Sequence, residues 1–271
     1  MDGRPIGVFD SGLGGLTAVH ALWRILPEED LIYFGDTARV PYGGRSRETL
    51  LQYARQDVRF LRTFDLKAIL IACGTVTTTS LPVLQAENDL PMVGVVEPAC
   101  RRALSVTRKK RIGMIATQAS VRSGAYEAAL RRLDPEVEVI CEPCPLFVPL
   151  VEAGRIRRGD VVIETVAREY LEPLRATGID TLILGCTHYP LLTDIIGDIM
   201  GPEVTLVSAG EESAFELKRM LTAGDMRASG ERQGTTAFYV SDRTEDFERI
   251  ASTFLQEDLR CMARRIDIEQ Y

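Results

Sequence analysis

Short apolar runs recur along the whole chain, each bounded by polar or glycine-containing segments. Their residues are mainly Val, Ile, Leu and Phe, which are typical of buried strands. Runs of this kind predict strands at 6–9, 31–34, 67–72, 92–96, 111–116, 137–140, 181–185, 204–207 and 238–240.

Segments with helical spacing separate these runs. Between residues 46 and 63, apolar side chains recur every three or four positions, with charged side chains on the opposite face. Ser208 and Glu211 form a capping box, which predicts a helix over 211–221. Strands that alternate with helices predict an α/β protein with mostly parallel sheets and helices on both faces.

Two cysteines occupy equivalent places in a weak internal repeat. Cys73 and Cys186 each end an apolar strand, and a threonine and then a proline follow each of them. Strands that run into polar loops at Asp10 and Thr117 precede the two cysteines at nearly matching distances. We therefore expect two similar halves, each presenting a cysteine at the carboxyl ends of its strands across a shared cleft.

The composition indicates a globular protein with reduced thiols. Of its 271 residues 45% are hydrophobic, and six cysteines stand at irregular spacing. The net charge of −7 and pI near 5.1 argue against nucleic acid as the primary partner. No apolar run approaches the roughly 20 residues that cross a membrane, and the start, MDGRPIGVFD, has no signal-peptide pattern. We expect a cytoplasmic protein without a membrane partner.

Two thiols that face each other suit proton transfer. A cation or a helix N-terminus lowers the pKa of a cysteine from its usual value of about 8.5, so that one thiolate can act as a base while its partner remains an acid. Such a pair can remove a proton from one face of a carbon and deliver one to the other face. The sequence therefore suggests inversion of a stereocentre without a cofactor.

Cofactor and metal sites are not predicted. The few lysines are Lys67, Lys109, Lys110 and Lys218. None has the setting of a Schiff-base lysine, which disfavours pyridoxal phosphate. The glycines at 12–15 lack the spacing of a dinucleotide loop. Cys141 and Cys144 form a C-x-x-C pair without partners at ligand spacing, and Cys100 and Cys261 are interpreted as buried thiols.

Seven motifs together resemble the cofactor-independent glutamate racemases of the aspartate/glutamate racemase superfamily. They cover the chain from residue 6 to about 210, in the family's order, and read DSGLGGLT, YFGDTARVPYG, ACGTVTTT, GVVEPA, IATQASVRSGAY, CPLFVPLVEAG and LGCTHYPLL. The resemblance implies two pseudo-symmetric α/β domains, 1–97 with 208–271 and 98–207, and an active site in the cleft between them. It also implies interconversion of L- and D-glutamate for peptidoglycan, and a homodimer.

The resemblance assigns roles to individual residues. Cys73 and Cys186 match the two catalytic acid/base cysteines. Asp10 matches an acidic group on the Cys73 side, His188 a group on the Cys186 side, and Glu152 a further position implicated in catalysis. The substrate-binding positions of the family correspond to Asp10, Ser11, Tyr42, Gly43, Gly74, Thr75, Thr117, Ser120, Thr187 and His188. Hydroxyls and backbone N–H groups at helix starts can hold carboxylates without arginine.

The chain departs from the family pattern at Gly74. The pattern usually reads Cys-Asn-Thr, so a carboxamide that helps to hold the substrate is absent here. We expect Thr77 or Thr78 to compensate, and Gly74→Asn to leave the reaction intact while changing KM more than kcat. The departure leaves another carboxylate substrate, such as aspartate, as an alternative.

Other interpretations remain open at this level. Cys186 could be a nucleophile with His188 as its base, as in a Cys/His hydrolase, although residues two apart in a loop need not meet. A binding protein on the same scaffold would need neither thiol, and free cysteine is often simply buried. Asp36 fits an active-site acid and a turn residue equally well.

Overall fold

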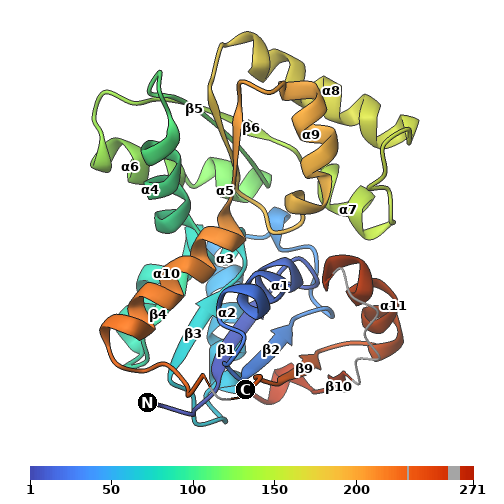
Figure 1. Ribbon diagram of the computed structural model, residues 1–271. Helices are drawn as coiled ribbons and strands as arrows, with labels where there is room; N and C mark the ends of the chain where they lie inside the picture. The colour runs from blue at the N-terminus through green and yellow to red at the C-terminus, as the bar shows by residue number, and fades with distance from the viewer. Residues whose placement is uncertain (231, 256–262) are drawn as a thin grey trace.

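Parallel strands alternate with helices along the chain, as predicted. The computed structural model describes residues 1–230, 232–255 and 263–271 (Figure 1). Its strands are β1 (Ile6–Asp10), β2 (Leu31–Gly35), β3 (Ala68–Ile71), β4 (Met92–Gly94), β5 (Arg111–Ala116), β6 (Glu138–Pro143), β7 (Thr181–Leu184), β8 (Thr205–Ser208), β9 (Thr236–Val240) and β10 (Arg264–Arg265). All nine predicted strands are present.

The helices fill the segments between the strands. They are α1 (Leu16–Ile25), α2 (Arg47–Leu61), α3 (Gly74–Glu87), α4 (Val96–Val106), α5 (Gln118–Arg122), α6 (Ala125–Leu133), α7 (Phe147–Glu152), α8 (Val161–Ala176), α9 (Thr193–Met200), α10 (Ala209–Ala223) and α11 (Thr244–Leu255), with short 3-10 helices η1 (Tyr42–Gly44), η2 (Tyr189–Leu192) and η3 (Ile268–Gln270). Ser208 caps α10 by accepting from the backbone N–H of Glu211, which confirms the predicted N-cap, and the helix begins at Ala209, two residues before the predicted start. None of the described helices has the length and apolar character needed to cross a membrane.

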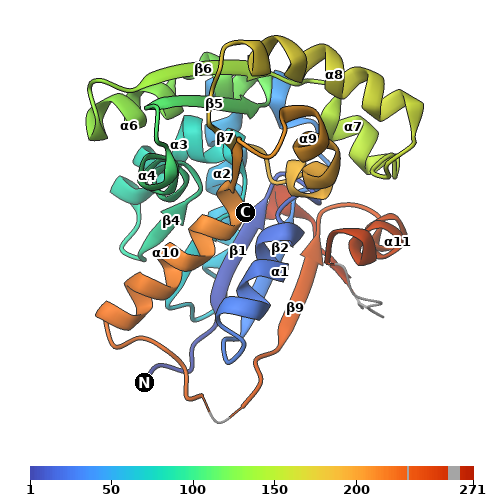
Figure 2. The same cartoon turned by 45° about the horizontal axis from the view of Figure 1, so that its top comes forward.

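The strands form two parallel sheets. One has the order β10-β9-β2-β1-β3-β4 and the other the order β6-β5-β7-β8. Figures 1 and 2 show the four-stranded sheet and its helices above the six-stranded sheet. The order β2-β1-β3-β4 in the first sheet is repeated as β6-β5-β7-β8 in the second. The internal repeat seen in the sequence is therefore a repeat of topology.

A continuous core joins the two sheets. One cluster of buried apolar side chains includes Val8 of β1, Ile115 of β5 and Leu184 of β7. Helix α10 follows β8, the last strand of the second sheet, and packs against both α1 and α4. The chain thus returns to the first sheet through α10, where β9 pairs with β2.

The two sheets correspond to the two predicted domains, apart from one residue. The strands of the six-stranded sheet lie within 1–97 and 208–271, and those of the four-stranded sheet lie within 98–207 except for Ser208, the last residue of β8. The division into two domains stays a prediction. Cys261 lies outside the described residues, whereas Cys100 is buried, as expected.

Candidate active site

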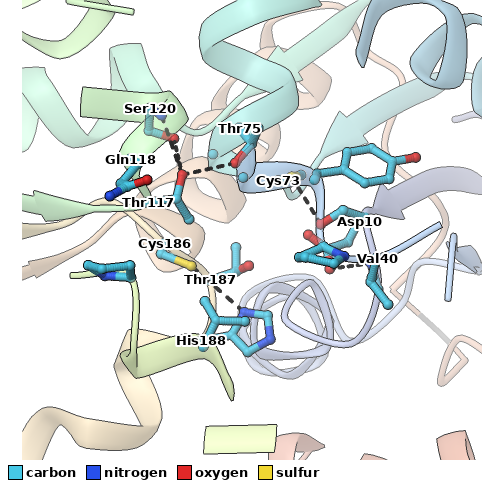
Figure 3. Close-up of a pocket in the computed structure, with 18 of the residues that line it drawn as sticks. Asp10, Val40, Cys73, Thr75, Thr117, Gln118, Ser120, Cys186, Thr187 and His188 are labelled. Carbon is cyan, nitrogen blue, oxygen red and sulfur yellow. Dashed lines mark hydrogen bonds between the residues drawn. The ribbon is translucent and has the colours of Figure 1, made fainter. Parts of the chain in front are cut away.

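A cavity of about 410 Å³ lies where the two sheets present the carboxyl ends of their strands to each other. Ligand sites in open α/β folds occupy this position. The cavity is lined by all the residues to which the resemblance assigned a catalytic or substrate-binding role: Asp10, Ser11, Tyr42, Gly43, Cys73, Gly74, Thr75, Thr117, Ser120, Glu152, Cys186, Thr187 and His188. Residues spread over most of the chain therefore meet in one place (Figure 3).

Equivalent elements of the two sheets supply the two thiols. Cys73 follows β3 and is the N-cap residue of α3, and Cys186 follows β7, shortly before η2. Strands β3 and β7 hold the same place in the repeated strand order. The repeat thus brings one thiol to the cavity from each half, and both thiols are buried.

Cys186 belongs to a chain of three side chains. Its sulfur lies 3.7 Å from Nδ1 of His188, and Nε2 of His188 lies 3.0 Å from Oε1 of Glu152. Burial lowers the pKa of His188, but the contacts with Cys186 and Glu152 outweigh it and raise the pKa to about 10. The imidazole therefore carries a proton at neutral pH and places a positive charge beside the sulfur.

Cys73 has a different environment. Its thiol donates to Oγ of Ser11 over 3.4 Å, and burial together with the nearby carboxylate of Asp10 raises its pKa to about 12. Burial also raises the pKa of Asp10, although His188 opposes that shift; Oδ2 of Asp10 accepts from the backbone N–H of Gly12 at 3.0 Å. Cys73 is therefore a protonated acid at neutral pH, while a cation faces Cys186.

Hydroxyl groups line the wall between the thiols. Oγ1 of Thr75 and Oγ1 of Thr117 are 3.1 Å apart, and the Thr117 hydroxyl donates to Oγ of Ser120, also over 3.1 Å. Thr75 comes from the first sheet's half and the other two come from the second (Figure 3). Among the described residues that line the cavity there is no lysine or arginine. Hydroxyls and backbone groups are the polar partners that this wall offers to a carboxylate.

Asp36 lies behind the cavity wall. Its carboxylate accepts from Arg39, from Ser241 and from the hydroxyl of Tyr42, and Arg39 also donates to the neighbouring Asp57. None of Asp36, Arg39 and Asp57 lines the cavity. The structure thus decides between the two interpretations of Asp36: it is a buried partner of the loop that carries Tyr42, and that tyrosine turns its hydroxyl away from the cavity.

Residues 18–212 match the Asp/Glu/Hydantoin racemase family. The chain belongs to this family. A glutamate racemase of Geobacter metallireducens is 46% identical over 255 residues, which is 94% of each chain. A crystal structure of a glutamate racemase isoform from Bacillus anthracis has a TM-score of 0.93 at 37% identity and covers 98% of both chains. The glutamate racemase of Francisella tularensis, solved in complex with D-glutamate, has a TM-score of 0.91 at 36% identity over 100% of both chains.

Gly74, where the chain departs from the family pattern, lies directly against the backbone of Gly185. A Cβ atom built there would lie well under 3.0 Å from the carbonyl oxygen of Gly185. The expectation that Gly74→Asn leaves the reaction intact stays a prediction, and the substitution requires a local shift of the backbone at Gly185 or Gly74. The proposed substitutes were wrong: Thr77 and Thr78 bond to backbone carbonyls of Ile71 and Thr75 and do not line the cavity.

The contact between Cys186 and His188 answers a question that the sequence left open. The two residues are only two apart in the chain, and residues so close in a loop need not meet. They do meet, because β7 ends at Leu184 and the following loop turns into η2. The contact is therefore compatible with a Cys/His hydrolase as well as with a racemase. Cys73, which lines the same cavity, distinguishes between them.

Several lining residues were not identified from the sequence. Val40 and Pro41 from one half and Val148 and Pro149 from the other form apolar parts of the wall, and Gln118 and Cys144 also line it. Apolar side chains carry no chemical signal of their own, although these lie within quoted motifs. Among the described residues no group of three or more His, Cys, Asp or Glu side chains is placed to hold a metal ion.

Proposed function

We propose that this protein interconverts L-glutamate and D-glutamate by proton transfer between Cys73 and Cys186. The observation that carries the proposal is the unequal state of two thiols in one cavity. Cys73 is held as a neutral thiol, and Cys186 faces a protonated imidazole. An acid and a base are thereby available at the same time, as a two-base inversion requires.

In one direction Cys186 acts as the thiolate base. It removes the α-proton from the face of glutamate that it contacts, while the Cys73 thiol delivers its own proton to the opposite face. A thiolate beside a cation is the reactive form of cysteine, and His188 supplies that cation, held in place by Glu152. In the other direction the same two groups exchange roles, so His188 must accommodate both forms of Cys186.

The polar groups of the cavity suit the two charged ends of an amino acid. The substrate ammonium would lie near the carboxylate of Asp10. The substrate carboxylates would lie against the hydroxyls of Thr75, Thr117 and Ser120 and the N–H groups at the start of α3. These contacts withdraw charge from the α-carbon as the proton leaves, and no cofactor is part of the scheme.

A Cys/His hydrolase mechanism accounts for fewer of the residues in the cavity than a two-thiol racemase does. It would use the contact between Cys186 and His188, but it assigns no role to Cys73 or to the repeat that places both thiols in the same cavity. Family membership adds weight on the side of racemisation. The relatives named above as glutamate racemases favour glutamate over aspartate as the substrate.

The proposal includes a physiological role. The enzyme would supply D-glutamate for peptidoglycan, as a homodimer in the cytoplasm. The resemblance to the glutamate racemases supports the supply of D-glutamate, the homodimer and the cytoplasmic location.

An optical assay of the purified protein tests the function. Circular dichroism of L-glutamate and of D-glutamate should decay to zero from both sides, because an equal mixture is the equilibrium of a racemase. L- and D-aspartate serve as the matched substrates and should change far more slowly. Faster decay of aspartate would assign a different substrate, and formation of an acyl-enzyme on Cys186 without inversion would favour the hydrolase.

A further inference from the structure

The aromatic ring of Phe254 packs against the imidazole of His188. The two ring centroids are 5.4 Å apart and the ring planes stand at 88°, which is the edge-to-face arrangement that aromatic pairs prefer. Phe254 is fully buried in the core that joins the two sheets. Because it does not line the cavity, it can act on the reaction only through neighbouring side chains.

The two rings come from different halves of the protein. His188 follows β7 of the four-stranded sheet, whereas Phe254 lies near the end of α11, which follows β9 of the six-stranded sheet. Helix α11 packs beside α1, and it lies beneath α7 in both views of the molecule (Figures 1 and 2). A segment near the C-terminus thus reaches the histidine that faces Cys186.

The other neighbours of the imidazole fix how it must be oriented. Its nitrogens Nδ1 and Nε2 face Cys186 and Glu152. A Cβ atom on Gly14 would overlap both Nδ1 and Cε1, so the backbone of the first half also lies directly against the ring. A half-turn of the ring would exchange its nitrogens for carbon atoms and end both polar contacts. Close packing on the ring opposes that turn, and Phe254 supplies part of this packing.

We propose that Phe254 is a positioning residue that holds the imidazole of His188 beside Cys186. This inference rests on the proposed two-thiol racemase, in which a positive charge beside Cys186 favours its thiolate. Without the ring of Phe254, the imidazole tilts or turns away and the sulfur loses its cation. The environment of Cys73 stays as it is, because that thiol bonds to Ser11.

Phe254→Leu tests the inference. It should lower kcat on the order of 10- to 100-fold, because about 1 Å of misplacement in a catalytic group has an effect of that size. KM should change less, since every residue that lines the cavity is retained. Phe247→Leu is the matched control: Phe247 is also a buried phenylalanine of α11, but its ring packs against those of Tyr33 and Phe238, at 6.2 and 5.9 Å. Its kcat should stay close to that of the wild type.

Alkylation of Cys186 separates positioning from general loosening. Iodoacetamide reacts with thiolates, so peptide mass spectrometry of the folded protein should show slower modification of Cys186 in Phe254→Leu than in the wild type. General loosening predicts the reverse: faster modification of Cys186 together with Cys100, which is buried and does not line the cavity. Unchanged or faster modification of Cys186, or an unchanged kcat, would overturn the inference.

A double variant shows whether the effect passes through His188. His188→Gln removes the cation itself, so adding Phe254→Leu to it should slow the modification of Cys186 no further. A second slowing of the same size would mean that Phe254 acts on Cys186 by another route, which contradicts the inference.

Phe254→Met decides the question if Phe254→Leu does not fold. Methionine adapts to irregular gaps in a core, but its flexible chain cannot hold the imidazole at a fixed angle. The same loss of kcat and the same slower modification are expected, and wild-type values of both would overturn the inference. The alkylation needs no substrate. A wild-type protein that inverts no glutamate would therefore overturn the proposed function, while the modification of Cys186 would still report on the contact between Phe254 and His188.

Discussion

At the scale of single residues, the protonation of His188 distinguishes the two thiols. A histidine this well buried would ordinarily lose its proton, because desolvation disfavours the charged form. Here the contacts with Cys186 and Glu152 reverse that tendency and raise the pKa of His188 to about 10. The charge that the site needs beside Cys186 is thus maintained by neighbours on both ring nitrogens.

The raised pKa of His188 predicts a pH-dependent contribution to stability. The folded protein binds this proton more tightly than the unfolded chain, whose histidine titrates near 6.5. The contribution is therefore complete below about pH 6.5 and is lost as the pH rises through about 10. Urea unfolding of wild type and His188→Gln should show a larger difference in unfolding free energy at pH 6 than above pH 10. Cys73 is present in both proteins, so its own titration cancels. An equal difference at both pH values would contradict the assignment.

Residue types at the strand ends could be predicted from the sequence, and their contacts could not. Asp10, Cys73 and Cys186 each stand at the end of an apolar run, and this order predicts their place at the carboxyl ends of strands. Asp10 and Cys73 lie there in the six-stranded sheet, and Cys186 lies there in the four-stranded sheet. The overlap that a side chain on Gly74 would make with Gly185 depends on how closely two halves approach. No pattern within one segment carries that information.

At the scale of elements, a buried polar network holds the loop that enters the cavity between β2 and α2. Arg39 bonds to Asp36, to Gln56 and to Asp57, and the Tyr42 hydroxyl donates to both carboxylates. Burial raises the pKa of Asp57 well above its usual range, and the neighbouring Asp36 adds to the shift. Helix η1, which includes Tyr42 and Gly43, is thereby tied to α2 and, through Ser241, to the end of β9.

Tyr42→Phe should loosen this loop without touching the thiols. Removing the hydroxyl leaves buried carboxylate oxygens short of a donor, so the free energy of unfolding should fall by about 1–3 kcal/mol. KM for glutamate should rise more than kcat falls, because a wall of the binding site moves and the acid/base pair does not. Tyr53→Phe is the control, since the Tyr53 ring packs on that of Tyr42 at 5.5 Å and its hydroxyl makes no hydrogen bond among the described residues. A fall in kcat alone for Tyr42→Phe would contradict this account.

The elements themselves follow closely from the hydrophobic pattern, with two instructive exceptions. Strand β6 continues to Pro143, beyond the predicted end at residue 140, because it is an edge strand and an edge tolerates a proline. Strand β10 was not predicted: Arg264–Arg265 is a short, exposed pair of arginines without apolar alternation. Both strands lie at sheet edges, where burial imposes little pattern on the sequence.

At the scale of the whole molecule, the repeated strand order brings one thiol to the cavity from each half of the protein. Each half supplies one cysteine after its third strand, and the cavity between the halves receives both. Pairing opposite thiols across a substrate is a property of this arrangement and not of either half alone. The repeat is visible in the sequence as two similar segments around Cys73 and Cys186. The cavity is not, because its shape depends on how the two halves pack against each other.

Isotope incorporation in D2O tests this two-thiol account most directly. The thiol that removes the α-proton retains it on its own face, while the opposite thiol delivers a proton already exchanged with solvent. Product formed early should therefore carry deuterium at the α-carbon while the remaining substrate stays largely protonated, starting from either L- or D-glutamate. Early product that retains a substantial share of the substrate hydrogen, or a Cys73→Ala protein that still inverts glutamate, would contradict the account.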